Sequence, residues 1–301
     1  MHANNLKKGS GKNKNKMEHS DLVEIIGQVE DLPTLPRTFI RITELVNNPK
    51  SSAKDLARVV TDDQVLTVRL LKLVNSSFYG FPQKISTVTG AIVLLGFDAM
   101  RNLLLTTSIF DIFSNKDKTN QVKLERLWDH SLGCAIGAKV IGNYLRYDRI
   151  EELFVSGLLH DIGKIVEMLF LPDDFAKVIS IVEDRDILMV AAENSVFGYN
   201  HAEVGKLLAE RWRLPPKLTN IIAHHHQPDL AGRVSLEASI VHFADILCRA
   251  LDMGSGWDNK IPPLNDGTWR NLQLELSTVE PIMEEIDKEF EDINQSIAYS
   301  S

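Results

Sequence analysis

The sequence predicts an all-α fold, and three observations support that prediction. Apolar residues return every three or four positions in the apolar segments, which is the period of an amphipathic helix. Helix-capping patterns precede several of these segments. Alternation of apolar and polar residues, the pattern of a half-buried strand, is scarce. We therefore expect a multi-helix bundle with an N-terminal helical subdomain.

The N-terminal half is expected to form that helical subdomain over residues 21–115. In LPRTFIRITELVNN the apolar side chains return at helical spacing. Ser52 is followed three residues later by Asp55, which predicts a capping box at a helix start. Downstream of the break SSFYGFPQKIS, two helices are expected to meet near Gly96.

The C-terminal half begins after a polar linker, SNKDKTNQ at residues 114–121, and is expected to form a second helical unit over residues 120–250. Its most apolar run, FVSGLLHDIGKIVEMLF at residues 154–170, is predicted to be the buried face of a helix. A capping box begins a further helix in NHAEVGKLLAERW. Residues 251–301 are predicted to be a Gly-, Asp-, Asn- and Pro-rich loop followed by an acidic helix around residues 276–295.

Composition and charge narrow the class of protein. The chain has 301 residues, and no apolar run approaches the roughly 20 residues that span a membrane. The net charge of −8 disfavours general nucleic-acid binding by the folded part, and residues 1–20 are expected to be a disordered basic tail. Two cysteines form no disulfide framework, so a cytoplasmic protein is the simplest expectation.

The histidines are unevenly distributed along the chain. Two of the nine lie in the tail, and the other seven fall between residues 130 and 242: His130, His160, His201, His224, His225, His226 and His242. Asp161 and Asp245 lie in the same predicted helical segments. Imidazole and carboxylate ligands together suit divalent transition ions, and helical bundles build such sites from ligands on several helices.

A purely structural interpretation of the adjacent residues His160 and Asp161 is also available. Buried polar pairs that satisfy each other are ordinary in protein cores. The segregation of the other histidines favours a metal site over that alternative. His242 is expected either to orient a ligand or to fill the core.

The local contexts of these residues resemble a known family. The segments LWDHS, GLLHDIGK, NHAEVGKLLAERWRLP, HHHQP and HFADIL match the ligand order of the HD superfamily of metal-dependent phosphohydrolases. Together with LPTLPRTFIRITEL, VTDDQVLTVRLLKLVNSSFYG and ISTVTGAIVLLGFDAMRNLLL, they resemble the HDOD family of bacterial signalling proteins. The resemblance covers roughly residues 25–250 and implies an HD-type metal-binding bundle at 120–250.

The resemblance also implies a ligand set for one or two divalent transition ions, Fe, Mn, Zn or Ni. One ion would be held by His130, His160 and Asp245. The second would be held by His201, His225 and His226. Because His224 makes a run of three histidines, the register of the doublet is open at this point.

Asp161 and Lys164 are the catalytic candidates. The resemblance implies that the Asp161 carboxylate bridges two ions, which would lower the pKa of a bridging water toward neutrality and supply a nucleophile for a phosphate ester. Lys164 lies three residues later, on the same face of a helix, and is expected to contact a phosphate oxygen.

Two functions follow from the resemblance. HDOD proteins are regulatory modules in bacterial signal transduction, which predicts contacts with an unidentified signalling protein or a nucleotide ligand. The complete ligand set instead favours a metal-dependent phosphohydrolase, a phosphodiesterase or phosphatase acting on a nucleotide or cyclic nucleotide. After His226 the chain reads QPDLAGRV and lacks the GYP tripeptide of the related HD-GYP enzymes, which argues against cyclic-di-GMP as a substrate. We expect the regulatory function, with catalysis as the alternative.

Overall fold

The computed structural model describes residues 121–298 throughout and the earlier part of the chain in pieces: 40–42, 44–45, 48, 50–62, 67, 70–71, 74–75, 81, 83–97, 100 and 104. Every secondary-structure element in these described residues is a helix, as the sequence predicts. The expected basic tail at residues 1–20 lies outside them. No helix in the described part of the chain combines the length and the apolar character needed to cross a membrane.

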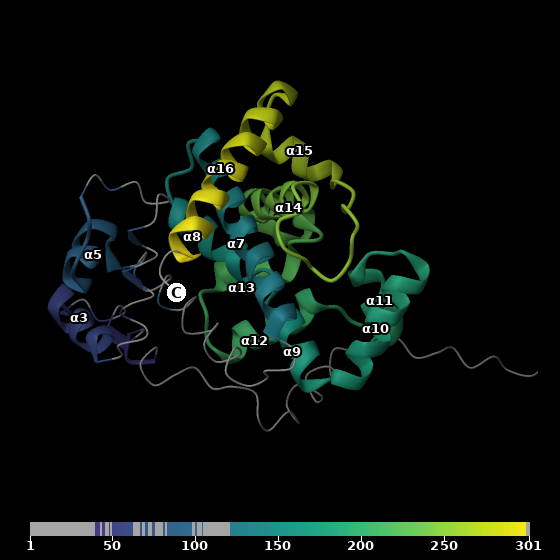
Figure 1. Cartoon of the computed structure of the whole chain (residues 1–301), viewed down its shortest axis with the longest axis horizontal. Coiled ribbons are helices and arrows are strands. Elements are labelled where there is room, and N and C mark those ends of the chain that lie inside the picture. Colours follow the sequence, from purple (N-terminus) through teal and green to yellow (C-terminus); the bar gives the residue numbers. More distant parts are fainter. Residues whose placement is uncertain are drawn as a thin grey trace, which may run out of the picture.

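Two N-terminal helices are described in full, and they pack against each other at one side of the molecule (Figure 1). These are α3 (Ala53–Thr61) and α5 (Val88–Leu95). The predicted capping box is present on α3, because the Ser52 side chain accepts from the Asp55 N–H and the Asp55 side chain accepts from the Ser52 N–H. Gly96 ends α5 with a positive φ of 84°, which glycine adopts without strain.

The C-terminal bundle contains the remaining elements. They are α7 (Gln121–Tyr144), α8 (Ile150–Leu159), α9 (Ile162–Phe170), α10 (Pro172–Arg185), α11 (Met189–Val196), α12 (His201–Arg211), α13 (Pro216–His224), η1 (Pro228–Val234), α14 (Ser235–Ala250), α15 (Asp266–Leu272), η2 (Leu276–Thr278) and α16 (Val279–Ala298). The expected acidic helix is α16, and α15 is an additional short helix that starts at the end of the predicted loop.

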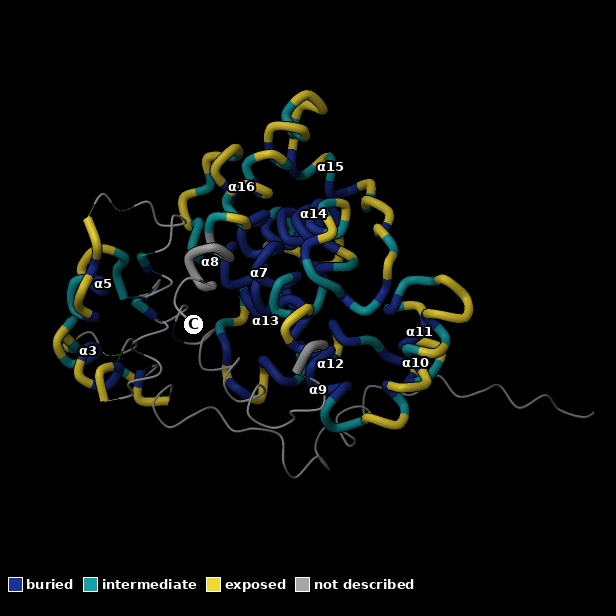
Figure 2. Tube along the Cα trace, in the orientation of Figure 1, coloured by how far each residue is buried: buried dark blue, intermediate teal, exposed yellow. Residues whose placement is uncertain are grey.

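The centre of the bundle is formed by α7 and α14, and α14 is drawn largely in the dark blue of buried residues in Figure 2. Helix α7 packs on α8, α14 and α16. The contact with α8 is close: a Cβ added at Gly157 would lie 2.7 Å from the carbonyl oxygen of Cys134. A glycine at this position therefore lets two backbones meet beside the predicted ligands His130 and His160.

The run at residues 154–170 does not form one helix. It divides into α8 and α9, with a break at His160 and Asp161. The Nδ1–H of His160 donates to the Gly157 carbonyl over 2.6 Å, so a side chain uses a backbone acceptor at the end of α8. Asp161 then leaves the helical region, with φ −97° and ψ 13°. The break turns both side chains toward one point in the core.

Candidate metal centre

The structure brings the seven predicted ligands together from five places in the bundle. His130 lies on α7, and Asp245 lies on α14. His160 and Asp161 occupy the break between α8 and α9, His201 is the first residue of α12, and the doublet His225–His226 follows directly after α13. All of them are buried except His226, which is half-buried.

Asp161 lies at the centre of the cluster. Its Oδ2 atom is 3.5 Å from Nε2 of His130 and 3.3 Å from Nε2 of His160. Its Oδ1 atom is 3.1 Å from Nε2 of His201 and 3.7 Å from Nε2 of His225. The two oxygens of one carboxylate therefore face two different sets of histidines, which is the arrangement of a bridging ligand.

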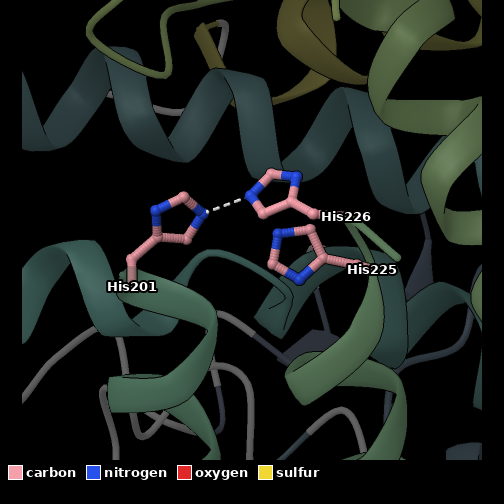
Figure 3. Close-up of side chains that lie close together, drawn as sticks. All are labelled: His201, His225 and His226. Atoms are coloured by element: carbon pink, nitrogen blue, oxygen red, sulfur yellow. Dashed lines mark hydrogen bonds between the residues drawn. The ribbon is translucent and has the colours of Figure 1, made fainter. Parts of the chain in front are cut away.

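Two separate triads flank Asp161 among the described residues, and within each the donor atoms lie within 4.8 Å of one another. One consists of His130, His160 and Asp245, and the other of His201, His225 and His226. In the second triad, the Nε2 atoms of His201 and His226 are 2.8 Å apart (Figure 3). The two rings are joined there by a hydrogen bond, so one of these nitrogens carries the hydrogen and the other accepts it.

The hydrogen bonds on the outer sides of the rings fix which nitrogen faces inward. Nδ1 of His160 bonds the Gly157 carbonyl, and Nδ1 of His225 bonds the Ile222 carbonyl over 2.8 Å. A carbonyl oxygen only accepts, so each Nδ1 carries the hydrogen. In the neutral rings, Nε2 therefore presents a lone pair to the carboxylate of Asp161.

Several of these inward-facing atoms make no hydrogen bond. They are both ring nitrogens of His130, Nε2 of His160 and His225, Oδ1 of Asp161 and Oδ2 of Asp245. Buried polar atoms are nearly always paired, and acceptors that face acceptors need a cation between them. A divalent ion in each triad satisfies this requirement, so the residues present fit the metal that the sequence implies.

The charge environment prepares the cluster for a cation. Burial disfavours ionisation of Asp161, but His160 and Lys164 outweigh it and hold the pKa of this carboxyl well below its ordinary value. Burial, followed by the neighbouring His160 and His201, lowers the pKa of His225 well below its ordinary value. Asp161 is therefore a carboxylate and His225 a neutral imidazole at neutral pH, which are the forms that bind metal.

Two residues that sequence reasoning missed hold the ligands in place. Glu193 on α11 accepts from Nδ1 of His201 over 2.7 Å and from its backbone N–H over 3.1 Å. Arg249 on α14 donates from Nε to Oδ1 of Asp245 over 2.8 Å. The spacing of Arg249, one helical turn after Asp245, was a usable signal for the second contact. No pattern in the sequence connects Glu193 with His201.

Lys164, which was expected to contact a phosphate oxygen, contacts the cluster itself. Its side chain is 0% exposed, and Nζ donates to Oδ2 of Asp161 over 2.6 Å and to the Gly256 carbonyl over 3.3 Å. In this conformation the lysine holds the predicted bridging carboxylate.

Two histidines whose roles the sequence left undecided, His224 and His242, lie outside both triads. Nδ1 of His224 bonds the Asn220 carbonyl over 2.9 Å, and the residue belongs to neither triad. Nδ1–H of His242 donates to the His225 carbonyl over 2.8 Å, and its Nε2 accepts from the Asn265 N–H over 3.2 Å. His242 thus supports the backbone of His225 from within the core.

A narrow pocket leads to the second triad. Its lining includes His201 and His226, Arg249, and residues of α11 and of the segment after α14. The interior volume is about 20 Å³, which is enough for a water molecule and too small for a nucleotide.

The comparisons with known proteins agree with this architecture. The chain is 28% identical over 233 residues to an uncharacterized protein of Treponema pallidum, and the match covers 76% of this chain and 44% of that relative. A crystal structure of an HDOD domain protein of unknown function from Geobacter sulfurreducens is 29% identical, with a TM-score of 0.71 over 88% of this chain and 96% of that one.

A third similar protein shows the same fold. It comes from Shewanella amazonensis, is provisionally named a phosphohydrolase, and is 24% identical with a TM-score of 0.69 over 90% of this chain and 97% of that one. The HDOD domain family matches residues 32–228, which is well over half of the chain. The chain is therefore a member of the HDOD family, within the HD superfamily.

Proposed function

We propose that this HDOD protein is a regulatory module of bacterial signal transduction whose histidine–aspartate cluster binds one or two divalent transition ions. The observation that carries the proposal is the position of Asp161. Each oxygen of its buried carboxylate faces a different triad of donors. A core that needed only a satisfied histidine–aspartate pair would have no use for the other five ligands.

The chain's own residues would hold the ions as two adjacent sites. His130, His160 and Asp245 would form one site, and three histidines would form the other: His201, His225 and His226. Glu193 keeps the His201 ring in the orientation that turns Nε2 inward. When bound, a pair of divalent ions lowers the pKa of water and stabilises charge on a phosphate group.

A regulatory role is supported by the small opening of the site. The pocket beside His201 and His226 admits water but no nucleotide in this conformation. The segment after His226, QPDLAGRV, lacks the GYP tripeptide of the HD-GYP enzymes. The ligand that such a module senses would be a nucleotide or another protein.

The alternative function is that of a phosphohydrolase acting on a nucleotide or cyclic nucleotide. It is favoured by the complete set of donors and by Lys164, whose Nζ lies 2.6 Å from Oδ2 of Asp161. In that case Lys164 would contact a phosphate oxygen as a point charge. Slow or absent turnover of cyclic-di-GMP is expected.

Metal content tests the proposal most directly. Protein purified without a metal-chelating column is expected to contain about one or two Fe, Mn, Zn or Ni ions per chain by elemental analysis. The Asp161→Ala variant should lose most of this metal. The His224→Ala variant is the matched control, because His224 neighbours the doublet without belonging to either triad, and it should keep its metal. Full retention of metal by Asp161→Ala contradicts the proposed site.

Turnover separates the two functions. Mn- or Fe-loaded protein is incubated with a panel of cyclic and linear nucleotides, with Asp161→Ala as the control. We expect binding without rapid hydrolysis. Rapid hydrolysis of any nucleotide that Asp161→Ala abolishes would make the protein an enzyme and end the purely regulatory interpretation.

A further inference from the structure

A segment that follows the matched family region lies over the metal centre. Residues 253–260, here called the strap, connect α14 to the loop before α15, whereas the HDOD match ends at residue 228. In Figure 1 the chain between α14 and α15 passes between α14 and α11. The strap lies beyond the residues that the HDOD match covers, as do α14 and its predicted ligand Asp245.

The N-terminal half of the strap is held against α7. Gly254 has a positive φ of 69°, and a Cβ there would overlap the backbone of α7 at His130. The Ser255 N–H donates to the Arg126 carbonyl over 3.0 Å. Met253 lies against Gly133 beside Sγ of Cys248. This half of the strap packs on the backbone of α7 at His130 and lies beside a buried thiol.

The C-terminal half is fastened by ion pairs and a backbone hydrogen bond. Asp258 accepts from Nη1 of Arg249 over 2.6 Å and from the Met189 N–H over 2.8 Å. The side chains of Lys260 and Asp186 form an ion pair. This half therefore ties the strap to α11 at the mouth of the narrow pocket.

Two buried cations converge on the middle of the strap. A Cβ built on Gly256 would lie 2.9 Å from Nζ of Lys164 and 2.9 Å from Nη2 of Arg249. Lys164 donates to the Gly256 carbonyl, and Arg249 donates to the Asp258 carboxylate. Both cations also bond a predicted metal ligand, Asp161 and Asp245 respectively. The strap thus supplies oxygen acceptors to the only two cations that contact ligand carboxylates within the described chain.

We propose that the strap is an internal competitor for phosphate at the Lys164–Arg249 pair. The Gly256 carbonyl and the Asp258 carboxylate occupy donors that a phosphate group would take. Binding of a phosphate ligand would lift the strap, and the ligand would be held by Lys164, by Arg249 and by the metal centre beside them. This inference rests on the proposed function, because it places the phosphate next to the ions.

Phosphate is the ligand class that fits this pair of side chains. The Arg249 side chain is only 8% exposed, with Nε and Nη1 already fixed by carboxylates, so its remaining donors are held rigidly. A fixed guanidinium favours oxyanions with several acceptor oxygens. A carboxylate such as that of Asp258 presents two such oxygens, whereas phosphate presents more and carries a larger charge.

The size of the pocket explains why the strap must move. Asp258 and Pro262 form part of the wall, together with Met189 of α11. With these residues in place, the interior of about 20 Å³ accepts no phosphate ester. Release of the Asp258 contacts separates the strap from α11 and opens that wall.

Thiol reactivity measures the opening without any use of catalysis or metal. The chain has two cysteines, Cys134 and Cys248, and both are buried, with Met253 of the strap beside Cys248. A thiol reagent such as DTNB should react faster when the strap lifts. In metal-free protein, Asp258→Asn is expected to raise the rate about tenfold, because it removes one charge-assisted hydrogen bond from the closed state.

Gly256→Ala provides a second variant that leaves Asp258 intact. Its added methyl group enters the position on which the two cations converge, so it should also raise the rate. The matched control is Glu237→Gln. Glu237 lies on α14, like Cys248, and its carboxylate pairs with Lys217 of α13, so the substitution removes a charge and touches neither the strap nor the thiols. This control should react at the wild-type rate.

Inorganic phosphate tests the competition itself. Added to metal-loaded wild-type protein, it should raise the thiol rate, whereas sodium chloride of equal ionic strength should not. Wild-type rates in both strap variants, or no response to phosphate with metal bound, would overturn the inference. If the protein binds no metal and the strap variants still react fast, the proposed function is wrong, whereas the conclusion that these contacts hold the strap closed still stands.

Discussion

Two polar clusters in this bundle differ in whether their members satisfy one another. In the Lys217 cluster, Nζ of Lys217 lies 2.7 Å from the Tyr147 hydroxyl, 2.9 Å from Glu152 and 2.8 Å from Glu237. In the histidine cluster, ring nitrogens with lone pairs face the carboxylate of Asp161. The first cluster is complete as it stands, whereas the second needs a cation.

The difference shows how a buried polar group can be assigned to structure or to binding. A structural cluster pairs each donor with an acceptor, so adding a ligand gains nothing. A binding cluster leaves acceptors unpaired at a cost that its ligand repays on binding. The distinction depends on hydrogen-bond geometry and is independent of how polar or how buried the cluster is.

The largest expected effect comes from removing the ion. Metal-loaded protein should be more resistant to unfolding than protein treated with a chelator, by about 4 kcal/mol if free metal exceeds its Kd a thousandfold. The gain should appear in urea titrations of the wild type and of a Lys217→Met variant alike. An equal stability of loaded and metal-free protein would contradict the contrast between the clusters.

The next effect concerns the packing that places His201. A Cβ on Gly163 would overlap the His201 carbonyl and lie 2.8 Å from the Gly205 N–H, because α9 and α12 are in direct contact there. Gly163→Ala is expected to cost about 3 kcal/mol and to lower metal content, since α12 must shift. Gly232→Ser is the control for glycine replacement, because no neighbouring atom lies near its Cβ position, although its positive φ of 59° carries a small strain.

A smaller effect is expected when the satisfied cluster is broken. Lys217→Met leaves the carboxylates of Glu152 and Glu237 without their shared cation. Because these groups are partly exposed, the loss should be about 2 kcal/mol rather than the larger cost of a fully buried pair. Metal content should stay at the wild-type value. A loss of metal in this variant would show that the two clusters are coupled.

The sequence could predict which residues gather in the cluster because histidine and aspartate in these motifs carry a chemical signature. Seven histidines segregate into one part of the chain, and the family motif around His160 and Asp161 implies which other residues join them. The capping boxes at Ser52 and Asn200 are equally local, and both are present in the structure. Patterns that depend on nearby residues, or on a shared family motif, were therefore recovered.

Contacts between distant segments could not be predicted in the same way. The bond between Glu193 and His201 depends on how α11 packs beside α12, and the strap reaches Lys164 across 92 positions of the sequence. The break at His160 was also missed, because apolar spacing continues through it. Helical periodicity predicts which face of a helix is buried. It does not predict where a side chain donates to a backbone carbonyl and the helix ends.

The last expected effect, and the smallest when counted per pH unit, is a pH dependence at the edge of the histidine cluster. Glu167 on α9 is 0% exposed, and burial, followed by the neighbouring Glu193 carboxylate, raises the pKa of Glu167 well above its ordinary value. The folded state therefore keeps this carboxyl protonated at a pH where the unfolded chain has released the proton. Its contribution to stability is fully present below the unfolded pKa of 4.5 and is lost as the pH rises toward the folded pKa.

Glu193 does not cancel this trend. Burial acts against ionisation of Glu193, but His201 outweighs it and lowers the pKa of that carboxyl, so its effect on stability is confined to pH values below the ordinary 4.5. Above that value, the free energy of unfolding of the metal-free wild type should fall by up to about 1.4 kcal/mol per pH unit through Glu167.

Glu167→Gln, which resembles the protonated carboxyl and does not titrate, should remove this slope in urea titrations over mildly acidic to mildly basic pH. Glu183→Gln, at an exposed position of α10, should keep the wild-type slope. Parallel pH profiles for wild type and Glu167→Gln would mean that Glu167 is ionised in the fold.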